Sequence, residues 1–148
     1  LFRFCSDYVC EKHGVEYEGD VPHGKGWHII RIEWHRAITR LAVAKPIVIF
    51  VSHSREAVIE TKTGTVYRIV PTLPERARST VMAIVDVIGY ASTDKVIADG
   101  KPAIRRVIRT KATPEVEAGD RTGKLPDVIS LSWDAFEREF REAIGKRS

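Results

Sequence analysis

The stretch IVIFVSHSREAVIETKTGTVYRIVP, residues 47–71, carries the strongest fold signals in the chain. It opens with five consecutive apolar residues, 47–51, and all of them except Phe50 are β-branched. This pattern is typical of a strand that is buried on both faces of a parallel sheet covered by helices. The run ends abruptly at the polar pair Ser52 and His53. The sequence therefore predicts a buried strand with polar side chains at its carboxyl end.

The second half of this stretch predicts a β-hairpin. Polar and apolar residues alternate over residues 57–62 and again over residues 66–70. Thr63 and Gly64 lie between the two runs, and a glycine at this place is a turn signal.

Outside residues 47–71, helices and strands alternate along the chain. A long helix is predicted over residues 27–44, where apolar side chains recur at helical spacing and should face the core: Trp27, Ile30, Trp34, Ile38 and Leu41. Other predicted helices cover residues 2–13, a short segment from Pro74, and residues 132–144 with Ser132 as the cap; predicted strands cover residues 85–90, 104–110 and 128–131. The order indicates an α/β domain with a hairpin insertion.

Composition places the chain in a broad class. Its 148 residues are 43% hydrophobic and 30% charged, which suits one domain with a core. No apolar stretch approaches the roughly 20 residues of a membrane-spanning helix. Cys5 and Cys10 form no CxxC motif, and we expect reduced thiols in a cytoplasmic protein. The net charge of +4 permits a polyanionic partner but does not require one.

The stretch GDVPHGKG, residues 19–26, is close to the phosphate-binding motif G-x-x-x-x-G-K-[ST]. Gly26 stands where the motif requires a hydroxyl residue, and no buried strand precedes the loop. We interpret this stretch as a glycine-rich loop that leads into a helix.

Glu60 and Lys62, in the tripeptide ETK, match the E-x-K pattern of many metal-dependent nucleases. Such enzymes also need an aspartate on a neighbouring strand, and residues 47–51 contain none. An exposed hairpin with cross-strand charge pairs explains the tripeptide as well. His28 and His35 are too far apart on one helix to share a metal, and no cysteine or histidine cluster has zinc spacing. We predict no metal site from these residues.

Two further groups of residues have a functional and a structural interpretation. Ser52 and His53 follow a strand end, where open parallel sheets bind ligands, but they also suit a strand-end cap. Six basic residues gather near one polar loop, mixed with acidic ones, and suit either phosphate contacts or local ion pairs: Arg105, Arg106, Arg109, Lys111, Arg121 and Lys124.

The order of these pieces resembles the phage-type AAA/RecA-like P-loop ATPases, which are found beside phage recombination genes. The matching stretches are HGKGW, KPIVIFVSHSRE, TKTGTVYRIVPTLPERAR, VDVIGYA and RTKATPEVEAGDRTGKLPDVI. The resemblance runs from about residue 1 to residue 140. It implies a RecA-like core with a mostly parallel central sheet, flanked by helices. Residues 1–148 would then be a single partial domain, the C-terminal two-thirds of the ATPase domain, with the phosphate loop and the Mg²⁺-binding acidic strand before Leu1.

The resemblance also implies a role for several residues. Ser52 and His53 would sense the γ-phosphate, and Arg121 or Lys124 would act in trans on a neighbouring subunit's ATP. Five basic residues would contact DNA: Arg55, Lys62, Arg68, Arg76 and Arg78. The family implies ATP and Mg²⁺ as cofactors, single-stranded DNA as partner, and a homo-oligomeric ring or filament. We expect a protein of a bacterial or phage-infected cell, and a chain that alone hydrolyses no ATP because the phosphate loop is missing.

Two alternatives stay open. The chain could be a nucleic-acid-binding module that uses no nucleotide, or a metal-dependent nuclease acting through Glu60 and Lys62.

Overall fold

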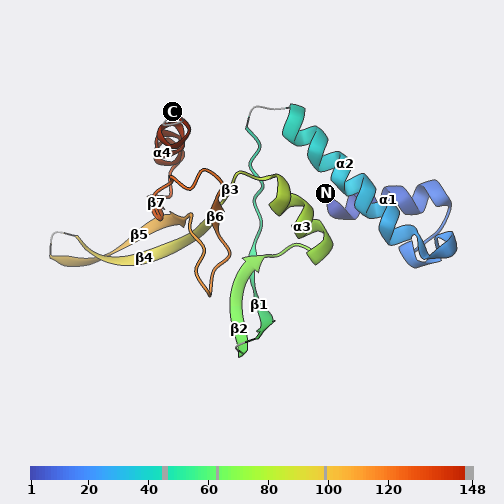
Figure 1. Cartoon of the computed structure of the whole chain (residues 1–148), viewed down its shortest axis with the longest axis horizontal. Helices are drawn as coiled ribbons and strands as arrows, with labels where there is room; N and C mark the ends of the chain where they lie inside the picture. Colours follow the sequence, from blue (N-terminus) through green and yellow to red (C-terminus); the bar gives the residue numbers. More distant parts are fainter. Residues whose placement is uncertain (45–46, 63, 99, 146–148) are drawn as a thin grey trace. The chain divides into compact units, whose positions relative to one another are not determined.

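The computed structural model describes residues 1–44, 47–62, 64–98 and 100–145. These residues form two compact units (Figure 1). The helical unit comprises Leu1–Ser52 and Leu73–Ile84, and the sheet unit comprises His53–Thr72 and Val85–Ser148. None of the described helices has the length and hydropathy needed to cross a membrane.

The helical unit contains three α-helices among the described residues, and they match the predicted helices closely. They are α1 (Phe2–His13), α2 (Gly26–Ala44) and α3 (Glu75–Ile84). Gly14 ends α1 in the left-handed conformation (φ 65°), which glycine adopts without steric cost. Two short 3₁₀ turns, Glu18–Asp20 and Pro22–Gly24, connect α1 to α2.

The core of the helical unit forms along the predicted apolar stripe of α2. Ile30, Trp34 and Ile38 are buried, whereas Trp27 and Leu41 at the two ends of the stripe are 45% and 40% exposed. The prediction that all five face the core is therefore wrong at both ends of the helix; Trp27 lies near the surface beneath the guanidinium of Arg76. The indole N–H of Trp34 donates a 3.2 Å hydrogen bond to the carbonyl oxygen of Ala77, which ties α2 to α3.

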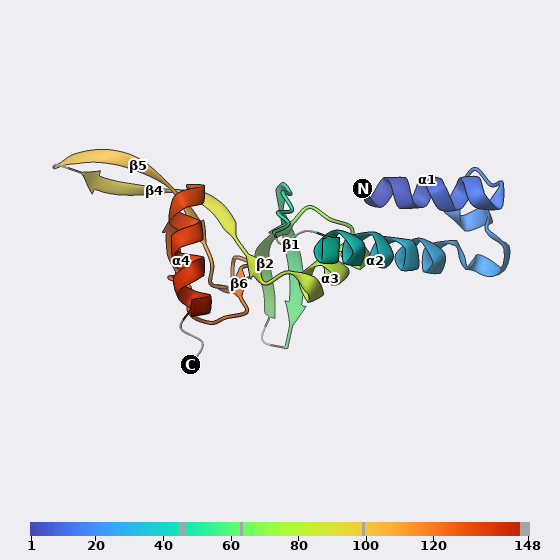
Figure 2. The same cartoon turned by 90° about the horizontal axis from the view of Figure 1, so that it is seen from above.

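The sheet unit contains antiparallel pairings throughout its described strands (Figures 1 and 2). β1 (Ser54–Thr61) pairs with β2 (Gly64–Pro71), which confirms the predicted hairpin; Thr63 lies outside the described residues. β3 (Val87–Ile88) pairs with β6 (Gly119–Asp120). A three-stranded sheet has the order β4 (Tyr90–Ala98), β5 (Lys101–Arg109), β7 (Val128–Ser130).

Helix α4 (Trp133–Gly145) completes the sheet unit as predicted. The hydroxyl of Ser132 accepts a hydrogen bond from the backbone N–H of Ala135 at 3.2 Å and so caps the helix. Phe136 and Phe140 stack with ring centroids 5.9 Å apart. Both rings pack against a small apolar core that also contains Leu125, Ile129 and Ala143.

The predicted parallel sheet is not observed. Residues 47–51 form no strand in the structure, and Val51 is 93% exposed. The reason is that the described residues provide no strand beside this run, so its backbone has no sheet to join. The described residues contain one parallel contact, an isolated bridge between Ile69 and Val116.

The β4–β5 hairpin is longer than the predicted strands 85–90 and 104–110. Residues 85–90 are divided between β3 and the start of β4, while β5 begins at Lys101. Gly100, with φ 74°, lies in the turn. The sequence contains Asp99-Gly100, and Asp-Gly is a strong hairpin signal, so the turn was visible in the sequence.

Candidate functional site

Ser52 and His53 lie where the chain passes from the helical unit to the sheet unit. Both residues are exposed and outside regular secondary structure, not at the end of a buried strand as predicted. The carbonyl oxygen of His53 accepts a 2.7 Å hydrogen bond from the N–H of Thr72, where the chain returns. This bond closes the base of the β1–β2 hairpin, so the position of His53 and the position of the hairpin are linked.

The β1–β2 hairpin separates its charges between two faces. Arg55 pairs in register with Val70, and Arg68 with Ala57, which places both arginines on one face of the ribbon. The opposite face carries Glu56 and Glu60. Lys62 is exposed beyond the end of β1, next to the turn.

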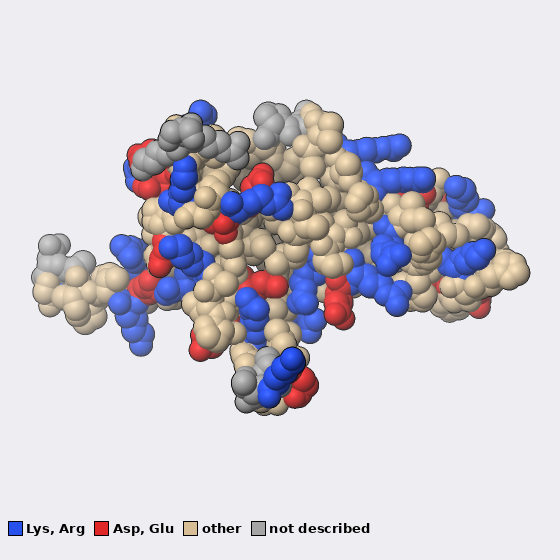
Figure 3. Space-filling view, in the orientation of Figure 1, with Lys and Arg blue, Asp and Glu red and all other residues tan. Residues whose placement is uncertain are grey.

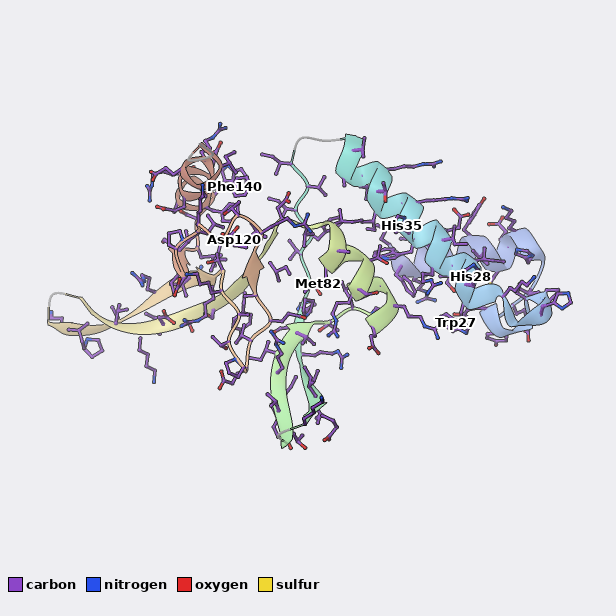
Figure 4. All side chains as sticks on the ribbon, viewed as in Figure 1. Trp27, His28, His35, Met82, Asp120 and Phe140 are labelled. Carbon is purple, nitrogen blue, oxygen red and sulfur yellow. The ribbon has the colours of Figure 1, made fainter. Side chains whose placement is uncertain are left out.

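The structure divides the five predicted DNA-contacting residues between the two units. Arg55, Lys62 and Arg68 belong to the sheet unit, whereas Arg76 and Arg78 lie on α3 of the helical unit. The guanidinium of Arg76 lies over the ring of Trp27, with its carbon 5.8 Å from the ring centroid, a cation–π contact. Trp27 marks the start of α2 in Figure 4.

The solvent-facing side of α2 is a basic surface that had no assigned role in the sequence. Arg31, Arg36 and Arg40 of α2 are exposed, and Figure 4 shows His28 and His35 on the same helix. Nδ1 of His28 lies 3.2 Å from the guanidinium of Arg31. The described residues contain no group of three or more His, Cys, Asp or Glu side chains placed to hold a metal.

Arg121 and Lys124 lie in a loop that is organised by Asp120. The Asp120 carboxylate accepts hydrogen bonds from the backbone N–H groups of Thr122, Lys124 and Leu125, each at 2.9 Å, and from the Thr122 hydroxyl at 2.8 Å. Burial acts to raise the pKa of Asp120, but these hydrogen bonds outweigh burial and lower its pKa below the ordinary value. The loop is therefore held around one carboxylate.

The partner of Arg121 was open in the sequence between Asp120 and Glu117, and the structure gives another. The Arg121 guanidinium lies 3.5 Å from the carboxylate of Asp86, and the backbone N–H of Arg121 donates to the Asp86 carbonyl oxygen at 2.8 Å. Both side chains are more than half exposed, so the ion pair is weak and solvent-screened.

A short backbone connection joins the hairpin to the segment that leads into this loop. The N–H of Ile69 in β2 donates to the carbonyl oxygen of Glu115 at 2.7 Å, and the N–H of Glu117 donates to the carbonyl oxygen of Ile69 at 2.9 Å. Backbone hydrogen bonds therefore join the hairpin to the segment that precedes the Asp120 loop.

The nuclease alternative gains no support from the hairpin. The Glu60 carboxylate accepts a hydrogen bond from the hydroxyl of Thr65, its cross-strand neighbour, at 3.3 Å. The paired strand β2 contributes no second carboxylate, since its sequence is GTVYRIVP.

Residues 19–26 do not form a phosphate loop. Residues 1–18 contain no strand, and Gly26 is the first residue of α2. A Cβ atom at Gly26 would lie 1.9 Å from the carbonyl oxygen of Glu18, so a serine or threonine does not fit there. The interpretation as a loop leading into a helix is confirmed.

Comparison with known families identifies the class of protein. A family model described as an AAA domain matches residues 1–122 of the chain. The chain therefore belongs to the AAA domain family. No curated protein and no solved structure gave a significant match.

Proposed function

We propose that this chain works in a RecA-like ATPase that binds ATP with Mg²⁺ and acts on single-stranded DNA in phage-type recombination or strand annealing. The observation that carries the proposal is the AAA domain match over residues 1–122. Assembly as a ring or filament in the cytoplasm of a bacterial or phage-infected cell belongs to the same proposal.

Ser52 and His53 are the proposed nucleotide sensor. A hydroxyl and an imidazole are groups that hydrogen-bond to a phosphate oxygen. Residues 19–26 offer no backbone cradle that would hold the phosphates of ATP. Ser52 and His53 are proposed to sense a phosphate by one contact, not to hold the nucleotide. Their position supports the proposal, because the hydrogen bond between His53 and Thr72 links the pair to the hairpin.

Arg121 and Lys124 are the proposed trans-acting cations. A cation held close to a transferring phosphate neutralises developing charge, and guanidinium and ammonium groups both suit this task. The Asp120 loop supports the assignment, since hydrogen bonds to one carboxylate fix the backbone on which both residues lie. Arg55, Lys62, Arg68, Arg76 and Arg78 remain the proposed contacts to the single strand.

The test measures ATP turnover and DNA affinity with the full-length protein. We expect single-stranded DNA to stimulate turnover and ATP–Mg²⁺ to change DNA affinity. The double variant Ser52→Ala/His53→Ala should lose this coupling while its DNA affinity without nucleotide stays unchanged. The double variant Ser79→Ala/His13→Ala removes the same groups elsewhere and should keep the coupling.

Two results would contradict the proposal and favour an alternative. DNA binding that depends on salt but not on nucleotide indicates a nucleotide-independent binding module. Mg²⁺-dependent DNA cleavage that is lost in Lys62→Ala indicates a nuclease.

A further inference from the structure

We propose that the outer face of the β4–β5 ribbon binds in a groove of double-stranded DNA. We define this outer face by six residues: Thr93, Lys95, Ile97, Pro102, Ile104 and Arg106. The inference deepens the proposed function and rests on it, because it adds a duplex contact to a protein proposed to act on single strands.

The register of the ribbon places these residues on one side. Thr93 pairs with Arg106, Lys95 with Ile104, and Ile97 with Pro102. Side chains alternate between the faces of a strand, so every second position shares a face. All six residues are exposed, and Ile97 and Ile104 are 73% and 74% exposed.

The inner face of the same ribbon is partly buried, although Lys101 and Arg105 are exposed on it. Val107 is fully buried there, and Asp94 forms an ion pair with Arg109 at 2.5 Å. From Val107 onward β5 also pairs with β7, and the N–H of Leu131 donates to the carbonyl oxygen of Arg106, whereas residues 101–105 pair with β4 alone. The outer face is therefore the more exposed side of the ribbon, since all six of its residues are exposed.

The charge of the outer face is positive without compensation. Lys95 and Arg106 are diagonal neighbours across the two strands. No carboxylate belongs to this face, and within the described part of the chain no ion pair engages either cation. Figure 3 shows Lys and Arg side chains together with acidic side chains along the β4–β5 ribbon.

The shape and side chains of the ribbon favour duplex DNA among polyanions. A two-stranded β-ribbon fits the major groove of B-DNA, which is about 12 Å wide. Single strands are usually held by stacking on aromatic rings, and the outer face has no aromatic residue. The major groove of A-form RNA is too narrow for side chains to read. Exposed Ile97 and Ile104 are suited to contact thymine methyl groups or to wedge against a base step.

The experiment titrates the full chain with a short fluorescent DNA duplex, without nucleotide, over a range of salt concentrations. Each phosphate contact contributes about 0.9 to the slope of log K against log salt. The double variant Lys95→Ala/Arg106→Ala should therefore lower the slope by about 1.8. Arg3→Ala/Lys12→Ala removes the same charge from α1 and should leave the slope unchanged. Thermal unfolding of each variant checks that it folds.

A second variant tests the apolar part of the face separately. Ile97→Ala/Ile104→Ala should weaken duplex binding at every salt concentration and keep the slope, because no phosphate contact is lost. Four results would overturn the inference: no duplex binding, stronger binding to a single strand than to the duplex, equal binding to double-stranded RNA, or binding to phosphatidylserine vesicles in place of DNA.

The measurement contains no nucleotide, so it separates the two proposals. Duplex binding that depends on Lys95 and Arg106 can persist in a protein that fails the ATP turnover test. ATP turnover stimulated by a single strand can likewise persist when the ribbon variants bind duplex normally.

Discussion

Replacing Asp120 by alanine tests whether one carboxylate organises the loop that carries Arg121 and Lys124. The substitution removes the acceptor for three backbone N–H groups and one hydroxyl. Leu125 is 2% exposed, so its N–H has poor access to water once the carboxylate is lost. An unsatisfied buried N–H costs about 1–3 kcal/mol, and the charge-assisted bonds from Thr122 and Lys124 are partly replaced by water.

We therefore expect Asp120→Ala to lower the free energy of unfolding by about 3 kcal/mol, which corresponds to a fall in Tm of about 6–12 °C for a chain of this size. Urea denaturation followed by circular dichroism at pH 7 measures the loss. Asp120→Asn retains an acceptor oxygen without the charge, and we expect it to lose about half as much, since charge-assisted hydrogen bonds are roughly twice as strong as neutral ones.

The pH dependence gives a second readout of the same carboxylate. The folded-state pKa of Asp120 is lowered, so its stabilisation is complete above the unfolded value of about 3.9 and is lost as pH falls through the folded pKa. The difference in stability between the natural protein and Asp120→Ala should therefore narrow below about pH 4. A loss smaller than about 0.5 kcal/mol, or a difference that stays constant down to low pH, would refute the reasoning, because changes of that size are typical of substitutions without structural effect.

Other substitutions test the packing of each unit by equilibrium unfolding. Gly26→Ala places a Cβ atom against the Glu18 carbonyl oxygen and should destabilise the helical unit by about 1–3 kcal/mol, because overpacking is destabilising. A free energy of unfolding equal to that of the natural protein would contradict the close approach of the two residues. Trp34→Phe removes the hydrogen bond to the Ala77 carbonyl oxygen and should cost at least about 1 kcal/mol, whereas an unchanged midpoint would show that the bond contributes nothing. Ser132→Ala removes the cap of α4 and should cost about 1 kcal/mol, with Ser132→Asp retaining stability; equal losses in both variants would exclude capping as the cause.

The sequence predicted correctly the elements that are specified by residues close together in the chain. The helical spacing of Ile30, Trp34 and Ile38 predicted α2, because an apolar stripe at that spacing has one face to bury. Ser132 predicted the start of α4, because the hydroxyl of a cap residue accepts a hydrogen bond from a backbone N–H of the helix that it begins. The order of the stretches also indicated the AAA class over most of the chain.

The strands that the sequence predicted poorly depend on pairing between segments of the chain that are not adjacent in sequence. The apolar run at residues 47–51 has the composition of a buried strand, but composition does not provide the neighbouring strand that burial needs. Strands β4 and β5 were underestimated because their outer positions mix charge with isoleucine, which weakens the alternation. The hydrogen bonds of Asp120 were partly visible, because an aspartate two residues before a threonine is suited to bond its own backbone.

The positions of the candidate residues were less predictable than the helices. Ser52 and His53 were expected at the end of a strand, and they instead lie where the chain changes units. Arg76 and Arg78 were grouped with the hairpin because they follow it closely in sequence, although they belong to α3. Sequence distance is a poor guide to shared location when a chain passes repeatedly between two units.

The helical unit is built from two separate segments of the chain, which has a consequence while the chain is being synthesised. Trp34 and its acceptor at Ala77 are 43 residues apart, and the β1–β2 hairpin is made between them. At ribosomal rates of about 5–20 residues per second, α2 waits about 2–9 s for α3. During that time the indole of Trp34 lacks its acceptor and is covered on the α1 side alone, by the ring of Phe2. Transiently exposed apolar surface favours aggregation, and a slow stretch of codons in the hairpin would prolong this stage.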